Sequence, residues 1–175
     1  MTRTIFVVPY DPHWAELYEQ EKEALCAVFG EELLEIHHIG STSIPGIKAK
    51  PVIDILPVVR DIQRVDDLND EMAELGYEAK GEYGILGRRY FRKGTEEKHT
   101  HHVHAFQFGN PEIARHVNFC AYLRAHPGDA RRYSELKEAL TKRHSHDIGA
   151  YTVGKDALIA ELDQKAKRWM EEQDR

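Results

Sequence analysis

The sequence has few cysteines, no long apolar run and no excess of positive charge. Its 175 residues include only two cysteines, Cys26 and Cys120. Their wide separation favours two reduced thiols in a cytoplasmic protein over a disulfide or a metal-binding pair. No apolar run reaches the roughly 18 residues that a membrane-spanning helix needs. The first residues reach Pro9 and Asp11 too soon for a signal peptide, so we expect a cytoplasmic protein that does not interact with membranes.

The charge balance limits the partners that the chain can be expected to bind. It has 24 Lys and Arg against 30 Asp and Glu, a net charge of −6 with histidines neutral. A general nucleic-acid-binding protein would show a basic surface, which this composition does not favour. Apolar residues make up 41% of the chain. This share is typical of a folded protein, and it leaves the oligomeric state unspecified.

Apolar periodicity predicts an α+β protein without internal repeats. We expect strands at 4–10, 32–39, 51–59, 77–83, 88–92 and 101–108. We expect helices from Pro12 to a stop at Gly30, at 61–75, from Asn110-Pro111 through Tyr122, at 129–144 and at 155–171. Mixed elements over 1–109 followed by helices over 110–175 predict a mixed β-sheet flanked by helices, with a C-terminal helical lobe packed on it. We expect residues 1–175 to form one domain.

A small, polar loop follows the strand predicted at 32–39. Gly40 permits a sharp turn, and Ser41, Thr42 and Ser43 offer hydroxyl and backbone N–H groups at the start of a short helix. Such a loop can bind a phosphate, and Lys50 adds positive charge nearby. An ordinary turn capped by its own hydroxyls is the alternative.

Asp54 lies in the apolar run V-I-D-I-L. A carboxylate there costs several kcal/mol unless it is paired, binds a metal or lies at the exposed end of the strand. Beside a phosphate held by the loop, Asp54 would be suited to bind a divalent ion. The alternative is a structural aspartate that caps a neighbouring loop.

Histidines are concentrated in one predicted strand, H-H-V-H-A-F-Q-F at 101–108. His102 and His104 share one face of such a strand, and His101 lies on the other. If this strand neighbours that of Asp54, the two imidazoles and the carboxylate form a set suited to Zn, Fe or Mn. His104 is also a candidate general base. We expect His99 and His101 to be solvated.

Several motifs resemble the GrpB family of largely uncharacterised proteins. They are H-H-I-G-S-T-S-I-P-G-I-K-A-K-P-V-I-D-I (37–55), R-R-Y-F-R-K-G (88–94), H-H-V-H-A-F-Q (101–107), R-H-V-N-F-C-A-Y-L-R-A-H-P (115–127) and Y-T-V-G-K (151–155). The resemblance covers most of the chain. That family is in turn similar to the nucleotidyltransferase superfamily, which implies a nucleotidyltransferase-like fold.

The resemblance implies a nucleoside triphosphate or another phosphorylated small molecule as ligand, with Mg or Mn as cofactor. Gly40, Ser41 and Asp54 match the superfamily's Gly-Ser step and first carboxylate. Of the basic block at 88–93, Arg89 and Arg92 become candidate phosphate clamps. Lys155, expected at the start of the last helix, is a further candidate because it ends the pattern Y-x-x-x-K.

The sequence departs from the superfamily at Leu56, where the second carboxylate of a D-x-D pair is expected. A third acid is also missing from residues 101–108. The leading hypothesis is a metal-dependent transferase of a nucleotidyl or phosphoryl group, with Asp54 and His104 as catalytic residues and Asp54, His102 and His104 as metal ligands. A non-catalytic module that binds nucleotides or coenzyme A-related ligands, and a His/Asp transition-metal enzyme, remain the alternatives.

Overall fold

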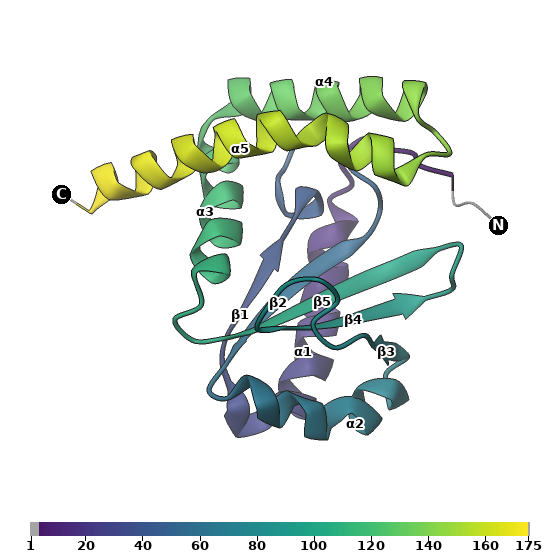
Figure 1. The fold of residues 1–175 in the computed structure, drawn as a ribbon, viewed down its shortest axis with the longest axis vertical. Coiled ribbons are helices and arrows are strands. Elements are labelled where there is room, and N and C mark those ends of the chain that lie inside the picture. Colours follow the sequence, from purple (N-terminus) through teal and green to yellow (C-terminus); the bar gives the residue numbers. More distant parts are fainter. Residues whose placement is uncertain (1–3, 175) are drawn as a thin grey trace.

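A computed structural model describes residues 4–174 and contains one five-stranded mixed sheet (Figure 1). The strands are β1 (Leu33–Ile39), β2 (Ile53–Val59), β3 (Tyr77–Ala79), β4 (Arg88–Gly94) and β5 (His99–Gln107), in the order β1-β2-β5-β4-β3. The central strands β2 and β5 are parallel, and the other pairs are antiparallel. The predicted α+β class and mixed sheet are therefore confirmed.

One face of the sheet is largely apolar and is covered by the N-terminal helix. Alternate residues of β2 and β5, including Ile53, Ile55 and Val103, pack against Trp14, Leu25 and other side chains of α1 (His13–Phe29). The short helix α2 (Asn69–Glu74) contributes Met72 to the same core. Period-two alternation in the strands therefore sends the other set of side chains, Asp54 among them, to the opposite face.

The three C-terminal helices pack on that opposite face. They are α3 (Pro111–Ala125), α4 (Pro127–Arg143) and α5 (Ile148–Gln173), and Figure 1 shows α4 and α5 side by side across one end of the sheet. Leu56, Val58 and Phe106 from the sheet share one buried cluster with Leu123 of α3 and Leu162 of α5. The helices thus cover the apolar end of this face and leave the strand positions around Asp54 next to a cleft.

Several predicted elements differ from the structure. Residues 4–10 form an isolated bridge rather than a strand, in which Val8 and Ala49 exchange two hydrogen bonds of 2.9 and 3.0 Å. The helix predicted at 61–75 is a 3-10 helix (Ile62–Leu68) followed by α2, and the strand predicted at 77–83 ends at Ala79. Short apolar runs do not distinguish these structures, because tertiary pairing decides which one forms.

The last helix, α5, begins at Ile148 rather than at 155. The Asp147 carboxylate accepts a hydrogen bond from the Ala150 N–H at 3.0 Å and caps this end. Gly154, just before the predicted start, lies inside the helix. A Cβ at Gly154 would lie 2.5 Å from Leu140 Cδ2, so the glycine permits close packing of α5 on α4.

Among residues 4–174, no helix is long and apolar enough to cross a membrane. The two cysteines are free thiols, with Cys26 partly buried in α1 and Cys120 buried in α3.

Truncating Leu162, which is fully buried between α5 and the sheet, tests whether lobe and sheet fold as one unit. We expect Leu162→Ala to lower the free energy of unfolding by about 2–5 kcal/mol through lost burial and the resulting cavity. The control Val153→Ala, at a position of α5 that is 68% exposed, should change it by no more than about 0.5 kcal/mol. Urea unfolding followed by circular dichroism measures both, and an early separate transition of the helices in Leu162→Ala would contradict a single unit.

Candidate functional site

The pairing of β2 with β5 brings Asp54, His102 and His104 together. Asp54 lies opposite His102 in the parallel register, so the neighbouring strands required by the histidine hypothesis are present. Asp54 Oδ1 lies 2.9 Å from His104 Nε2 and 3.5 Å from His102 Nδ1. The Asp54 side chain is 25% exposed, so a ligand in the cleft can reach it.

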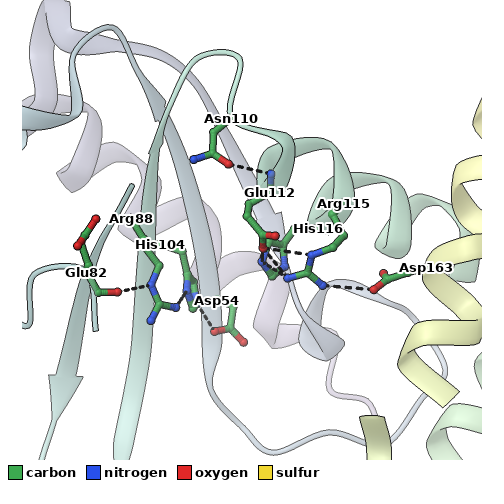
Figure 2. Close-up of polar contacts among 9 residues, drawn as sticks. All are labelled: Asp54, Glu82, Arg88, His104, Asn110, Glu112, Arg115, His116 and Asp163. Atoms are coloured by element: carbon green, nitrogen blue, oxygen red, sulfur yellow. Dashed lines mark hydrogen bonds and ion pairs between the residues drawn. The ribbon is translucent and has the colours of Figure 1, made fainter. Parts of the chain in front are cut away.

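Arg88 determines which nitrogen of His104 carries the proton. Its guanidinium lies 3.3 Å from His104 Nδ1 and is held by the carbonyl oxygens of Glu82 and Tyr83, at 3.1 and 2.8 Å. A guanidinium can only donate, so Nδ1 accepts and Nε2 donates its proton to Asp54. Figure 2 shows this chain from Glu82 through Arg88 and His104 to Asp54.

Asp54 is ionised in this arrangement. Burial opposes ionisation, but the hydrogen bonds from His102 and His104 outweigh it and hold the pKa of this carboxyl well below its usual range. The carboxylate is therefore available as a metal ligand or as a hydrogen-bond acceptor throughout the neutral pH range.

Gly40 is required by the close approach of the loop to Asp54. Its φ is +73°, a conformation that glycine adopts without strain. A Cβ at this position would lie 2.6 Å from Asp54 Oδ2. The Gly-Ser step of the sequence therefore places the loop directly against the carboxylate.

The three loop hydroxyls point in different directions. Ser41 Oγ accepts a hydrogen bond of 2.7 Å from the ammonium of Lys137. Thr42 is buried and donates to the Val52 carbonyl at 3.3 Å, and Ser43 donates to the Gly40 carbonyl at 2.6 Å. Only Ser41 therefore has its hydroxyl directed at a side chain of the cleft, whereas Thr42 and Ser43 stabilise the loop itself.

Three lysines line the same cavity as Asp54. The ammonium groups of Lys50 and Lys155 lie 5.2 and 4.4 Å from the ring centre of Tyr151, and that of Lys137 lies 4.6 Å from the ring centre of Tyr133. Burial and repulsion from Lys50 lower the pKa of Lys155 to about 8. Burial, followed by repulsion from Lys155 and Lys50, lowers that of Lys137 to about 7. An anion in this place would relieve the repulsion.

The Asp54 cluster and the lysines line one cavity of about 290 Å³. It is lined by the loop, the start of β2, the β4–β5 hairpin, helices α4 and α5 and the N-terminal segment: Thr4, Ile5, Phe6, Gly40, Ser41, Thr42, Lys50, Pro51, Val52, Asp54, Glu97, Lys98, His99, His102, Tyr133, Lys137, Ile148, Tyr151 and Lys155. An acid–imidazole cluster and a group of cations therefore face the same space.

The expected phosphate clamp on β4 requires a correction. Arg89 pairs with Ala105 in the antiparallel register, and its guanidinium binds Asp66 at 2.7 Å, on the face away from the cleft. Arg92 shares the face of His102 but binds Glu96 at 3.2 Å and does not line the cavity. Arg88, one residue before Arg89 and so on the other face of β4, contacts His104 and, like Arg92, does not line the cavity.

Lys155 lines the cavity as expected, but it does not start a helix. It lies two turns inside α5, whose first residue is Ile148. The argument that a ligand must offset the unfavourable helix dipole at this lysine therefore does not apply.

Lys137 and His99 are site residues that sequence reasoning missed. Lys137 follows Tyr133 by four positions, so a charged residue on the apolar face of a helix was the available signal. His99, expected to be solvated, is buried, and its Nδ1 lies 3.0 Å from His102 Nε2.

The donor set at Asp54 fits a divalent transition metal. One oxygen of Asp54 and one nitrogen each of His102 and His104 lie within 4.8 Å of one another. Imidazole and carboxylate together suit Mn, Fe or Zn better than Mg, which prefers oxygen ligands. His99 supports this use of His102 by bonding its other ring nitrogen. His104 joins the set only after its Nε2 proton leaves and Arg88 withdraws from Nδ1.

A family model described as GrpB protein matches residues 4–165. UPF0157 protein YqkA of Bacillus subtilis (strain 168) is 50% identical over 167 residues, which cover 95% of this chain and 48% of that relative. The chain thus spans about half the length of this relative. The dephospho-CoA kinase of Mycolicibacterium paratuberculosis is 25% identical over 187 residues, which cover 93% of this chain and 46% of the kinase.

Two solved structures share the fold. The crystal structure of conserved protein GrpB from Enterococcus faecalis has a TM-score of 0.89 at 46% identity and covers 94% of this chain and 99% of its own. Terminal uridylyl transferase 4 from Trypanosoma brucei with bound dUTP has a TM-score of 0.54 at 15% identity, over 90% of this chain and 55% of its own. The fold is therefore nucleotidyltransferase-like.

Two glycine substitutions distinguish the effect of the Gly40–Asp54 contact on stability from the effect of backbone strain alone. Gly40 and Gly46 both have positive φ, +73° and +87°, but nothing lies within 4 Å of a Cβ at Gly46. We expect Gly46→Ala to lower the free energy of unfolding by about 1–2 kcal/mol. Gly40→Ala should lower it further, because the new methyl group displaces the Asp54 carboxylate. Chemical denaturation measures both, and equal losses would show that the Asp54 contact is unimportant.

Proposed function

The chain belongs to the GrpB family, and we propose that it binds a nucleoside triphosphate together with a divalent metal and transfers a nucleotidyl or phosphoryl group to an acceptor hydroxyl. The observation that carries this proposal is the composition of one cavity. Its lining includes Asp54 and His102 together with the cations Lys50, Lys137 and Lys155. A polyphosphate chelating a metal ion is a ligand that complements both kinds of group at once.

The residues have distinct roles in this proposal. Asp54 and His102 hold the metal, and Lys50 and Lys155 attract the phosphates. Gly40 allows the loop to approach the metal site, and Ser41 lies beside the phosphate chain. The bound metal supplies positive charge for the phosphate oxygens and the leaving group. Because the donor set contains imidazole, we expect Mn²⁺ to support binding better than Mg²⁺.

His104 acts in this scheme through its hydrogen bond to Asp54. With Nδ1 facing Arg88 and Nε2 donating to the carboxylate, it has no free lone pair for a substrate proton. We therefore propose that His104 orients the Asp54 carboxylate and, through its hydrogen bond, keeps it ionised. It becomes a metal ligand or general base only when Arg88 moves away.

A second candidate function is a binding module that does not catalyse transfer. Leu56 supports it, because the position expected to hold a second carboxylate is fully buried in the apolar core and cannot ligate a metal. The similarity to a dephospho-CoA kinase makes coenzyme A-related nucleotides worth including among the ligands. This module would bind its ligand with little dependence on metal or on Asp54.

Thermal unfolding with nucleoside triphosphates and coenzyme A, each with Mn²⁺, Mg²⁺ or EDTA, tests the proposal. Ligand at about a hundred times its dissociation constant stabilises the fold by about 2.7 kcal/mol, a shift of roughly 5–10 °C for this size of domain. We expect the largest shift with a triphosphate and Mn²⁺, and its loss in Asp54→Asn. Turnover of the triphosphate by the unaltered protein is then assayed with the same metal.

Two lysine variants provide the matched control. Lys155→Met removes a cation of the cleft, whereas Lys142→Met removes one from α4 whose side chain is 76% exposed. Only the first should weaken binding, by about tenfold or more for a lost charged contact. A shift that ignores metal and Asp54 would select the binding module, and a response to Zn²⁺ or Mn²⁺ alone would select a transition-metal enzyme.

The pKa of Lys155 gives the affinity a defined pH dependence. Burial and the neighbouring Lys50 lower this pKa to about 8, so the ammonium loses its charge as the pH rises through that value. We expect triphosphate affinity to fall between pH 7 and 9 and binding near pH 8 to take up protons. Calorimetry in buffers of different ionisation enthalpy measures the uptake, and the same uptake in Lys155→Met would contradict this assignment.

A further inference from the structure

Ser41 and Lys137 form a pair that phosphate binding does not by itself explain. The two side chains come from the loop after β1 and from α4, and Lys137 Nζ lies 2.7 Å from Ser41 Oγ. Lys137 is only 2% exposed, whereas Ser41 is partly exposed and lines the cavity. A solvent-accessible hydroxyl is therefore in direct contact with a desolvated amine.

The surroundings of Lys137 favour its neutral form. Burial is the main cause, and the charges of Lys155 and Lys50 add to it, so that its pKa falls to about 7. The titratable groups that share the cavity with it are Lys50, Asp54, Glu97, Lys98, His99, His102, Tyr133, Tyr151 and Lys155. Near neutral pH a large share of molecules holds a neutral amine, which can accept the hydroxyl proton of Ser41.

We propose that Ser41 is a nucleophile, that Lys137 is its general base, and that the group attacked is a phosphorus of the bound nucleoside triphosphate. The choice of a phosphorus rests on the proposed function, because the cations of Lys50 and Lys155 lie in the same cavity. The pairing of serine with a lysine base rests only on the geometry of these two residues.

The reaction balances without any further reactant. A bond forms between Ser41 Oγ and the phosphorus, and the bond from that phosphorus to the bridging oxygen breaks. The rest of the polyphosphate leaves with the electron pair, and the hydroxyl proton passes to Lys137 Nζ. Attack at the α-phosphorus leaves a nucleotidyl-serine and pyrophosphate, and attack at the terminal phosphorus leaves a phosphoserine and a diphosphate.

Substrate binding changes the proton affinity of Lys137. Phosphates beside Lys50 and Lys155 offset the repulsion that, after burial, favours the neutral amine. In those molecules in which the amine is still neutral, its higher proton affinity favours transfer of the Ser41 hydroxyl proton to Nζ. The other two loop hydroxyls are less exposed than Ser41. Ser43 donates to the Gly40 carbonyl, and Thr42, only 2% exposed, has its hydroxyl between His38 Nε2 at 2.9 Å and the Val52 carbonyl at 3.3 Å.

Labelling with a fluorophosphonate, which modifies activated serines, tests the pair without any nucleotide. We expect an adduct on Ser41, located by peptide mass spectrometry, whose rate of formation rises with pH through about 7 as Lys137 becomes neutral. Ser41→Ala should remove the adduct. Ser134→Ala, on the same helix as Lys137, should leave it unchanged.

Two variants of Lys137 test whether it acts on Ser41 by accepting a proton or only through its positive charge. Lys137→Met places an apolar chain of similar length in a buried position, and thermal unfolding confirms that it folds. Lys137→Arg keeps the charge but cannot deprotonate. Both should slow labelling on the order of 100-fold or more, the range of a lost general base. Normal labelling of Lys137→Arg would overturn the base, and no labelling of the unaltered protein would overturn the nucleophile.

Triphosphates that carry an isotope at the α- or the terminal phosphorus identify the electrophile. Label retained on Ser41 after acid quench from either position supports the proposal and tells the two products apart. Triphosphate binding without a Ser41 adduct of either kind would overturn it and leave the proposed function intact. Fluorophosphonate labelling of Ser41 with no response to any triphosphate would support the serine–lysine pair and overturn the proposed function.

Discussion

The arrangement of the site depends on one carboxylate held on the central strand of the sheet. Asp54 is ionised because His102 and His104 approach it from the neighbouring parallel strand and outweigh the cost of its burial. Gly40 must then be a glycine, since any side chain would collide with that carboxylate. The close approach of the loop, the pairing of β2 with β5 and the contact of Arg88 with His104 all serve to hold this carboxylate in place.

The helical lobe supplies positive charge to the cleft through Lys137 and Lys155. The repulsion and burial of these lysines lower the stability of the lobe itself. Lys137 and Lys155 lie close enough to Lys50 for their pKa values to fall by repulsion in addition to burial. Such a group of cations stabilises an anion more than it stabilises the empty fold, and this is a property of binding sites. Burial, with the same repulsion added to it, favours the neutral form of Lys137, the proposed base. Binding of phosphate and activation of a hydroxyl therefore have a common physical origin.

The elements with strong periodicity were predictable, and those that depend on pairing were not. The apolar run around Ile53 and Ile55 reads as a buried strand, and it is one. The segment 4–10 has similar apolar character but forms no strand, and its backbone bonds Ala49 through Val8 and Ser145 through Ile5. Gly154 comes just before the predicted start of the last helix, whereas in the fold it is the point at which α5 contacts Leu140. Both differences arise from contacts between distant segments.

The sequence by itself determined the types of side chain available for chemistry and their periodicity. A carboxylate in an apolar strand, histidines two residues apart and a Gly-Ser loop all indicated a site, because each is costly or unusual unless it has a partner. Only the tertiary structure decided which partners meet. The strand register selected Arg88 over Arg89, and the packing of α4 brought Lys137 to Ser41. Contacts between residues far apart in the chain depend on the folding of the whole backbone, which local periodicity does not specify.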